Sequence, residues 1–179
     1  MKKNLIKIMA LATLGSLILI GCGTAQQASA PAAPAAAGTD DLKKQVEDIK
    51  GALPKFAIPM REVGDRFDDM YFAAKGGNWA LASYMSKYMD KAMTPAKITK
   101  PAEYPAWTSF YTGTFDPVNK AIAAKDFAAF DKAYTSAIES CNGCHSSMGY
   151  KFVKIPKPQA PVDTHLDYSL KSEPGDVPK

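Results

Sequence analysis

The sequence predicts an all-α protein: an antiparallel four-helix bundle with an extra short N-terminal helix and an irregular, proline-containing C-terminal tail. Apolar residues recur at intervals of three and four through successive segments between Asp40 and Cys141, which is the spacing of amphipathic helices. No segment shows convincing alternation of apolar and polar residues, the pattern of a strand. Glycine, asparagine and proline separate the segments, and short connections favour helices that run up and down beside one another.

The first two helices are expected over residues 40–50 and 55–75. In the first, Leu42, Val46 and Ile49 share one face, which continues to Leu53 before Pro54 ends the helix. The second ends at the Gly76-Gly77 pair. Its inward residues keep helical spacing and are Phe56, Met60, Val63, Phe67, Met70, Tyr71 and Ala74.

Three further segments complete the bundle. Asn78 can cap a helix that ends near Met93, and the prolines between Thr94 and Pro105 predict a loop. A helix is expected over residues 107–124, with Pro117 as a kink or restart. The last helix begins at Asp126, and its apolar period runs through Phe127, Phe130, Ala133, Tyr134, Ala137 and Ile138 into Cys141. Beyond Ile155 the prolines predict either an arm lying on the bundle or a disordered tail.

The N-terminal end has the layout of an export signal. Residues 1–21 carry Lys2, Lys3 and Lys7 before an uncharged apolar run of about 13 residues, too short to span a bilayer. The run ends in Leu-Ile-Gly-Cys, which resembles the lipobox of bacterial lipoproteins and implies that Cys22 is lipidated. An ordinary signal cleaved at a small residue is the alternative. By the same resemblance, Gly23 in place of an aspartate favours the outer membrane, with the domain facing the periplasm.

Four regions follow from these boundaries: residues 1–21 as signal peptide, 22–39 as lipidated cysteine and flexible Ala/Pro linker, 40–155 as the helical bundle, and 156–179 as the irregular tail. The linker has no charge and no large apolar residue, so it cannot bury enough surface to fold. Without the three signal lysines, the chain has 19 basic and 18 acidic residues, so the net charge falls from +4 to about +1. This charge argues against a nucleic-acid binder.

Nothing in the sequence indicates an enzyme. There is no glycine-rich phosphate loop, and the Asp68-Asp69 pair and the other carboxylates look like ordinary helix surface.

The five residues Cys141-Asn142-Gly143-Cys144-His145 form the attachment pattern of c-type haem. On a helix, residues three apart lie on one face, so both thiols can add to the two vinyl groups on one porphyrin edge while the adjacent imidazole reaches the iron. A thioredoxin-like redox pair would need a βαβ context, which the sequence lacks. Structural zinc would need more ligands than His165, the only other histidine, and a chance match also stays open.

A single CNGCH motif near the C-terminal end of a predicted four-helix bundle resembles the class II cytochromes c, the family of cytochrome c′ and its low-spin, methionine-ligated relatives. The resemblance covers residues 56–150. It implies one covalently attached haem c, with His145 as the proximal ligand of the iron. In the low-spin branch the sixth ligand is a methionine near the start of the first bundle helix, and Met60 occupies that kind of position.

The sixth ligand has alternatives in this sequence. Methionine is a common core residue, so Met60 competes with Met70, with a methionine of the third helix, with an open site and with His165. Phe67 and Tyr71 are expected to pack against the haem, although plain core packing is the common role of such aromatics. The leading hypothesis is a membrane-anchored electron carrier that meets redox partner proteins. The alternatives are a five-coordinate protein that binds small gases such as NO or CO, and a subunit of a larger respiratory or metal-oxidising assembly. The resemblance also makes a homodimer an open option.

Overall fold

The computed structural model describes residues 38–177. The expected signal peptide, Cys22 and almost all of the linker therefore lie outside the described residues. Over 38–177 the chain forms helices and no strand, apart from an isolated bridge between Asn78 and Ser172. The all-α prediction is confirmed.

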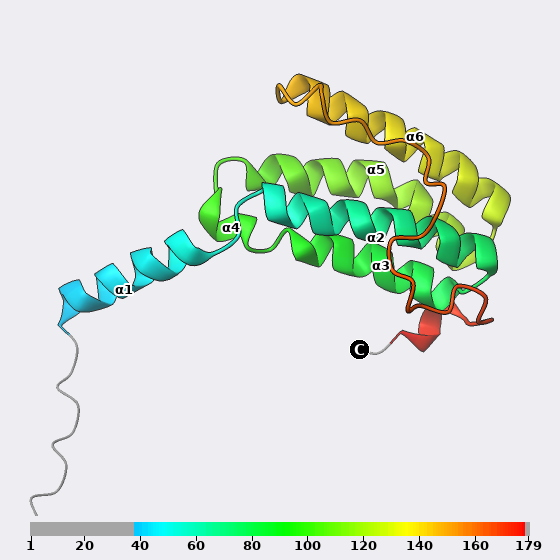
Figure 1. Ribbon diagram of the computed structural model, residues 1–179, viewed down its shortest axis with the longest axis horizontal. Helices are drawn as coiled ribbons and strands as arrows, with labels where there is room; N and C mark the ends of the chain where they lie inside the picture. The colour runs from blue at the N-terminus through cyan, green and yellow to red at the C-terminus, as the bar shows by residue number, and fades with distance from the viewer. Residues whose placement is uncertain (1–37, 178–179) are drawn as a thin grey trace, which may run out of the picture. The chain divides into compact units, whose positions relative to one another are not determined.

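The described residues form six α-helices and a short 3-10 helix (Figure 1). Their bounds are α1 Thr39–Ala52, α2 Ala57–Gly76, α3 Trp79–Ala92, α4 Ala96–Thr99, α5 Tyr104–Ala124, α6 Phe127–Ser147 and η1 Pro174–Asp176. Asn78 and Asp126 cap α3 and α6 as predicted. The side chain of Asn78 accepts a hydrogen bond from Leu81 N, and that of Asp126 accepts one from Ala129 N, each at 3.0 Å. Gly77 ends α2 in the left-handed conformation, with a φ of 84°.

The loop expected between Thr94 and Pro105 is partly wrong. Residues Ala96–Thr99 form the single turn α4, and α5 begins at Tyr104 rather than at Trp107. Proline is compatible with the first turn of a helix, because its missing N–H would have no partner there. Pro95 immediately precedes α4 and Pro105 lies in the first turn of α5, so these prolines start helices instead of excluding them. Helix α5 also continues through Pro117 without a restart.

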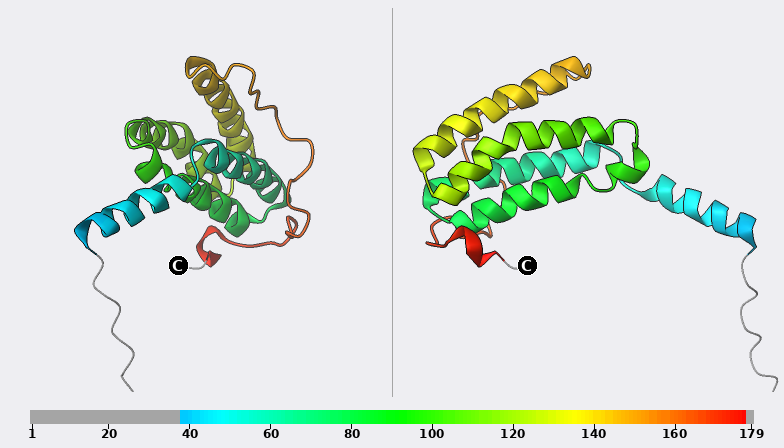
Figure 2. Two further views of the ribbon diagram at one scale, coloured as in Figure 1. Left: turned by 60° about the vertical axis from the view of Figure 1, so that its left-hand side comes forward. Right: turned by 180° about the vertical axis from the view of Figure 1, so that it is seen from behind.

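The core lies among the four long helices α2, α3, α5 and α6, with contacts between α2 and α3, α3 and α5, α5 and α6, and α2 and α6 (Figures 1 and 2). At its centre the ring of Phe67 on α2 stacks on Tyr134 of α6 with centroids 4.0 Å apart, and meets Phe115 of α5 edge-on at 5.7 Å. All three residues are buried. Offset aromatic pairs of this kind add to the free energy gained by burial.

The segment after Ile155 is an arm that lies on the helices. Asp69 of α2 is buried, and its Oδ1 accepts hydrogen bonds from Val162 N at 2.8 Å, Asp163 N at 3.2 Å and the Tyr168 hydroxyl at 2.8 Å. The arm passes so close to Gly76 that a Cβ there would overlap the carbonyl of Tyr168. The expectation that Asp69 is ordinary helix surface is therefore wrong, because its carboxylate serves the backbone N–H groups of a segment more than 90 residues away.

Candidate functional site

The CNGCH motif lies on the last two turns of α6. Cys141 and Cys144 are separated by three positions on a continuous helix, so their side chains leave the same face. The helix ends directly after the motif: Met148 is its C-terminal cap residue, Gly149 is left-handed with a φ of 85°, and Tyr150 N donates to the carbonyl of His145 at 2.7 Å. The motif thus lies on a continuous helix, and the chain changes direction directly after it.

Both cysteines are free thiols and half-buried. Burial, reinforced by the neighbouring Cys144, raises the pKa of the Cys141 thiol to about 12. A thiol with such a pKa stays protonated at neutral pH and reacts slowly as a nucleophile. Cys141 therefore does not have the lowered pKa of a redox-exchange cysteine, which further weakens the thioredoxin-like interpretation.

His145 is half-buried, and its Nδ1 is one of two buried side-chain nitrogens that have no hydrogen-bond partner within the described residues; the other is Arg66 Nε. A buried polar atom without a partner costs free energy. Because this nitrogen is enclosed, the missing partner is a cost to the fold and does not by itself indicate a bound group.

Asn142 joins the motif to the chain that leaves it. Its Nδ2 donates to the carbonyl of Ile155 at 3.0 Å, and its Oδ1 accepts from Ile155 N at 2.9 Å. The amide side chain thereby satisfies both backbone groups of one residue, as a neighbouring strand would. We call this pair the Asn142–Ile155 clamp. The sequence offered no signal for it, because any residue can occupy this position of the attachment pattern.

Phe67 and Tyr71, expected beside the haem, belong to the aromatic core of α2. Phe67 stacks on Tyr134, and the ring centroid of Tyr71 lies 5.0 Å from that of Tyr134. The Tyr134 hydroxyl donates to the Phe67 carbonyl at 3.0 Å. Tyr134 precedes Cys141 by two helical turns on the same face, so it is the aromatic residue that links the core to the motif. That seven-residue spacing was visible in the sequence.

The candidate sixth ligands differ in exposure. Met60 lies in the first turn of α2 and is half-buried against the core. Met70, Met85, Met89 and Met93 are buried among other apolar side chains, as expected for core residues. The side chain of His165 is 94% exposed and its Nδ1 lies 3.3 Å from Asp163 Oδ1, the arrangement of a surface histidine.

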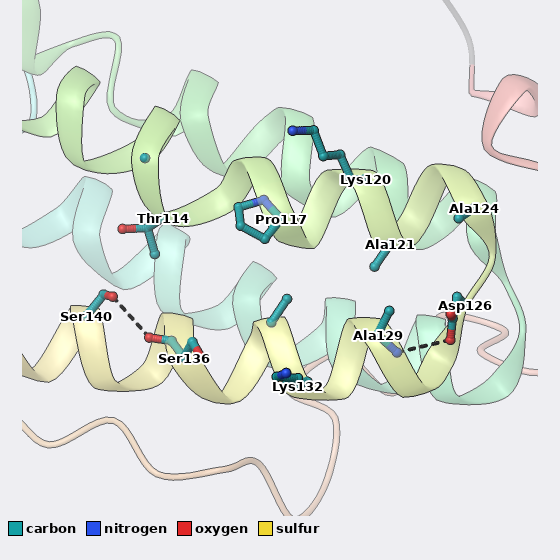
Figure 3. Close-up of a pocket in the computed structure, with 12 residues that line it drawn as sticks. Thr114, Pro117, Lys120, Ala121, Ala124, Asp126, Ala129, Lys132, Ser136 and Ser140 are labelled. Atoms are coloured by element: carbon teal, nitrogen blue, oxygen red, sulfur yellow. Dashed lines mark hydrogen bonds between the residues drawn. The ribbon is translucent and has the colours of Figure 1, made fainter.

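A groove of about 610 Å³ runs between α5 and α6 toward the motif (Figure 3). Its lining combines small side chains from both helices with the charged Lys120, Asp126 and Lys132, and Ser140 at its far end immediately precedes Cys141. The residues of α6 in this groove, among them Ala129, Ala133, Ser136 and Ser140, follow a helical stripe that Cys144 continues. Cys144 therefore lies at the edge of the face of α6 that lines the groove, whereas Cys141 lies on the face of Tyr134.

The donor set fits a covalently attached haem: two free thiols on one helix face, and an adjacent half-buried imidazole. Over residues 38–177, no three His, Cys, Asp or Glu side chains gather into a group suited to a metal ion. None of the helices described is long and apolar enough to cross a bilayer. No protein-family model, curated protein or solved structure matches this chain.

Proposed function

We propose that this protein is a monohaem c-type cytochrome of the class II kind that transfers electrons as a lipid-anchored protein of the cell envelope. The observation that carries the proposal is the placement of Cys141, Cys144 and His145 on consecutive turns of one helix, with both thiols free and the imidazole half-buried beside them. Bound haem supplies a one-electron couple of the iron. The protein's own part is to hold the group and to limit the access of water to it.

The proposed arrangement is an antiparallel four-helix bundle of α2, α3, α5 and α6. Two-residue connections join α2 to α3 and α5 to α6, and each of these pairs is in contact, as expected for helices that reverse direction. Helix α2 also contacts α6. The connections and contacts support the bundle predicted from the sequence.

Met60 is the proposed sixth ligand. Phe67 and Tyr134 lie opposite each other, so in an antiparallel pair with equal rise per residue, seven residues toward the start of α2 correspond to seven toward the end of α6. This register brings Met60 level with Cys141. A thioether ligand raises the reduction potential and favours electron transfer over gas binding.

The remaining features of the proposal concern the cell. Cys22 is the proposed lipid attachment site, which would anchor the protein to the outer membrane with the domain in the periplasm. Redox proteins are the proposed partners, and the protein needs no catalytic residues of its own.

The test is production of the full chain in a bacterium that attaches haem to exported cytochromes. We expect a covalent adduct that carries one haem per chain and survives denaturation, and a low-spin spectrum that carbon monoxide does not shift. Cys141→Ser and Cys144→Ser should each remove one of the two covalent bonds. A chain that acquires no haem under these conditions would refute the proposal.

Met60→Leu tests the sixth ligand separately, because it changes the side-chain volume little. We expect a high-spin centre in a protein whose helical content is unchanged. If the unaltered protein is already high-spin and binds carbon monoxide, Met60 is not a ligand, and gas binding replaces electron transfer as the proposed function.

A further inference from the structure

The arm is bonded to both of the helices that carry the proposed haem ligands. At one end, the Asn142–Ile155 clamp ties it to the middle of the CNGCH motif on α6. Further along, the buried Asp69 of α2 accepts a hydrogen bond from Val162 N at 2.8 Å. Figure 1 shows the arm running back along α6 and then turning across α2. The arm therefore connects the motif itself to the helix that bears Met60.

The chain between these two anchors has little conformational freedom. We call residues 155–162 the proline segment. Proline fixes its own φ at about −65° and restricts the residue before it. Among the first seven residues of the segment, Gln159 alone is neither a proline nor followed by one, because the segment contains Pro156, Pro158 and Pro161. Few alternative conformations are left, so the distance that the segment spans is nearly fixed.

The middle of the proline segment also lies between α6 and α2. The Lys157 Nζ is 2.5 Å from Asp131 Oδ1 on α6 and 5.1 Å from the ring centroid of Tyr71 on α2. An ion pair to one helix and a cation–π contact to the other thus accompany the two end anchors. The segment is bonded to both helices along its length.

We propose that the proline segment sets the position of the motif half of α6 relative to Met60, and that Asp69 is the positioning residue that fixes its far end. Asp69 acts through the arm and not on the haem. Met60 and Asp69 belong to one continuous helix, so a shift of the anchor at Asp69 shifts Met60 relative to His145. The inference rests on the proposed haem site, because it concerns the spacing of the two proposed iron ligands.

The first test is amide hydrogen exchange in the exported full chain, measured by peptide mass spectrometry. Asp69→Asn keeps the size of the side chain but removes the charge that accepts the hydrogen bonds of the arm. A combined variant with glycine at all three prolines keeps the anchors and frees the connection between them. In both variants we expect exchange over residues 141–147 to become at least about tenfold faster. Exchange over residues 127–138 should not change, because the aromatic core holds that half of α6.

Two further variants of the same arm grade the effect. Tyr168→Phe removes one of the donors to Asp69 but keeps the ring that packs edge-on against Phe72, so its effect should be smaller. Lys171→Met is the matched control, because it removes a hydrogen bond between the arm and the Gly76 carbonyl that lies beyond the Asp69 anchor. Exchange over residues 141–147 should be unchanged in this control. Circular dichroism should show the same helical content in all variants.

The second test is carbon monoxide binding by the haem-loaded protein. The apparent affinity for carbon monoxide rises with the fraction of molecules in which Met60 has left the iron, so Asp69→Asn should raise it at least about tenfold over Lys171→Met. The haem content should stay at one per chain. A merely stabilising role of Asp69 would lower the free energy of unfolding without this change in ligand binding.

Two results would overturn the proposal: unchanged exchange over residues 141–147 in Asp69→Asn and in the glycine variant, or unchanged carbon monoxide affinity despite faster exchange. A chain that acquires no haem at all refutes the proposed function instead. Hydrogen exchange on that chain still decides whether the proline segment holds the motif half of α6, so the two failures are distinguishable.

Discussion

The two halves of α6 share one helix and one apolar period but differ in how they are held. In the first half, Phe130 and Tyr134 are fully buried, and Ala137 and Ile138 complete the stripe. In the second half, Cys141, Cys144 and His145 are only half-buried, although they continue the same helix. The core anchors α6 through its first half and leaves the residues suited to chemistry accessible in the second.

The difference shows that a single helix can separate stability from function. The first half gains free energy from aromatic packing with α2, whereas the Asn142–Ile155 clamp ties the second half to the chain that follows it. Substitutions should therefore cost most in the first half and least in the second.

The largest effect is expected at Tyr134. Tyr134→Ala removes the stack on Phe67, leaves a cavity and deletes the hydrogen bond to the Phe67 carbonyl, so the free energy of unfolding should fall by about 3–5 kcal/mol. Tyr134→Phe keeps the ring and should cost only about 1 kcal/mol. Urea unfolding followed by circular dichroism measures both. Equal losses for the two variants would mean that the hydroxyl, not the ring, anchors the helix.

A smaller loss is expected at the clamp. Asn142→Ala removes both hydrogen bonds to Ile155 and leaves part-buried backbone groups without partners, which should lower the free energy of unfolding by about 1–3 kcal/mol. The chain between Tyr150 and Lys154 should also become more sensitive to trypsin, which cleaves after Lys151 and Lys154. Unchanged cleavage would show that other contacts hold this segment.

Replacement of Gly143 should stabilise the protein, in contrast to the substitutions of Tyr134 and Asn142. It is exposed inside α6, and a Cβ there would meet nothing within 4 Å. Gly143→Ala should therefore raise the free energy of unfolding by about 0.5–1 kcal/mol, because alanine loses less backbone entropy in a helix. The haem content should not change, since the attachment pattern leaves this position free. A lower free energy of unfolding for Gly143→Ala would mean that the second half of α6 is packed more tightly than its partial burial indicates.

The last prediction concerns pH and Asp68, whose charge acts on Tyr134. Burial, followed by the charges of Asp69 and Asp65, raises the pKa of Asp68 from 3.8 to about 6. Between these two values the folded protein binds more protons than the unfolded chain, so the free energy of unfolding should fall as pH rises through this window. Asp68→Asn should flatten that slope in urea unfolding at several pH values.

A second carboxyl group acts in a separate pH range. The hydrogen bond from Lys157 lowers the pKa of Asp131 below 3.8, so its stabilising contribution is lost only at lower pH. If the free energy of unfolding of Asp68→Asn still falls by the same amount between pH 3.8 and about 6, a group other than Asp68 causes this pH dependence.

Much of the local structure could be predicted from the sequence. The periods of α2, α3, α5 and α6, the caps Asn78 and Asp126 and the glycine stop of α2 are properties of neighbouring residues. The candidate donors are equally local, since five consecutive residues carry them. The error between Thr94 and Pro105 arose because proline was taken as a helix breaker where it stands in or before the first turn of a helix.

The sequence by itself determined that four long helices form and which residues could hold a haem, because helix periodicity, capping and the CNGCH spacing act over a few residues. Only the tertiary structure decided which apolar faces are covered: the stripe of α6 is buried, whereas Leu42, Val46 and Ile49 on one face of α1 are exposed, although both helices have helical spacing. It also decided that Asp69 is buried beneath the arm and that Asn142 holds Ile155. Burial and these hydrogen bonds depend on segments that are distant in the sequence and come into contact only in the folded chain. The local spacing of residues therefore cannot predict them.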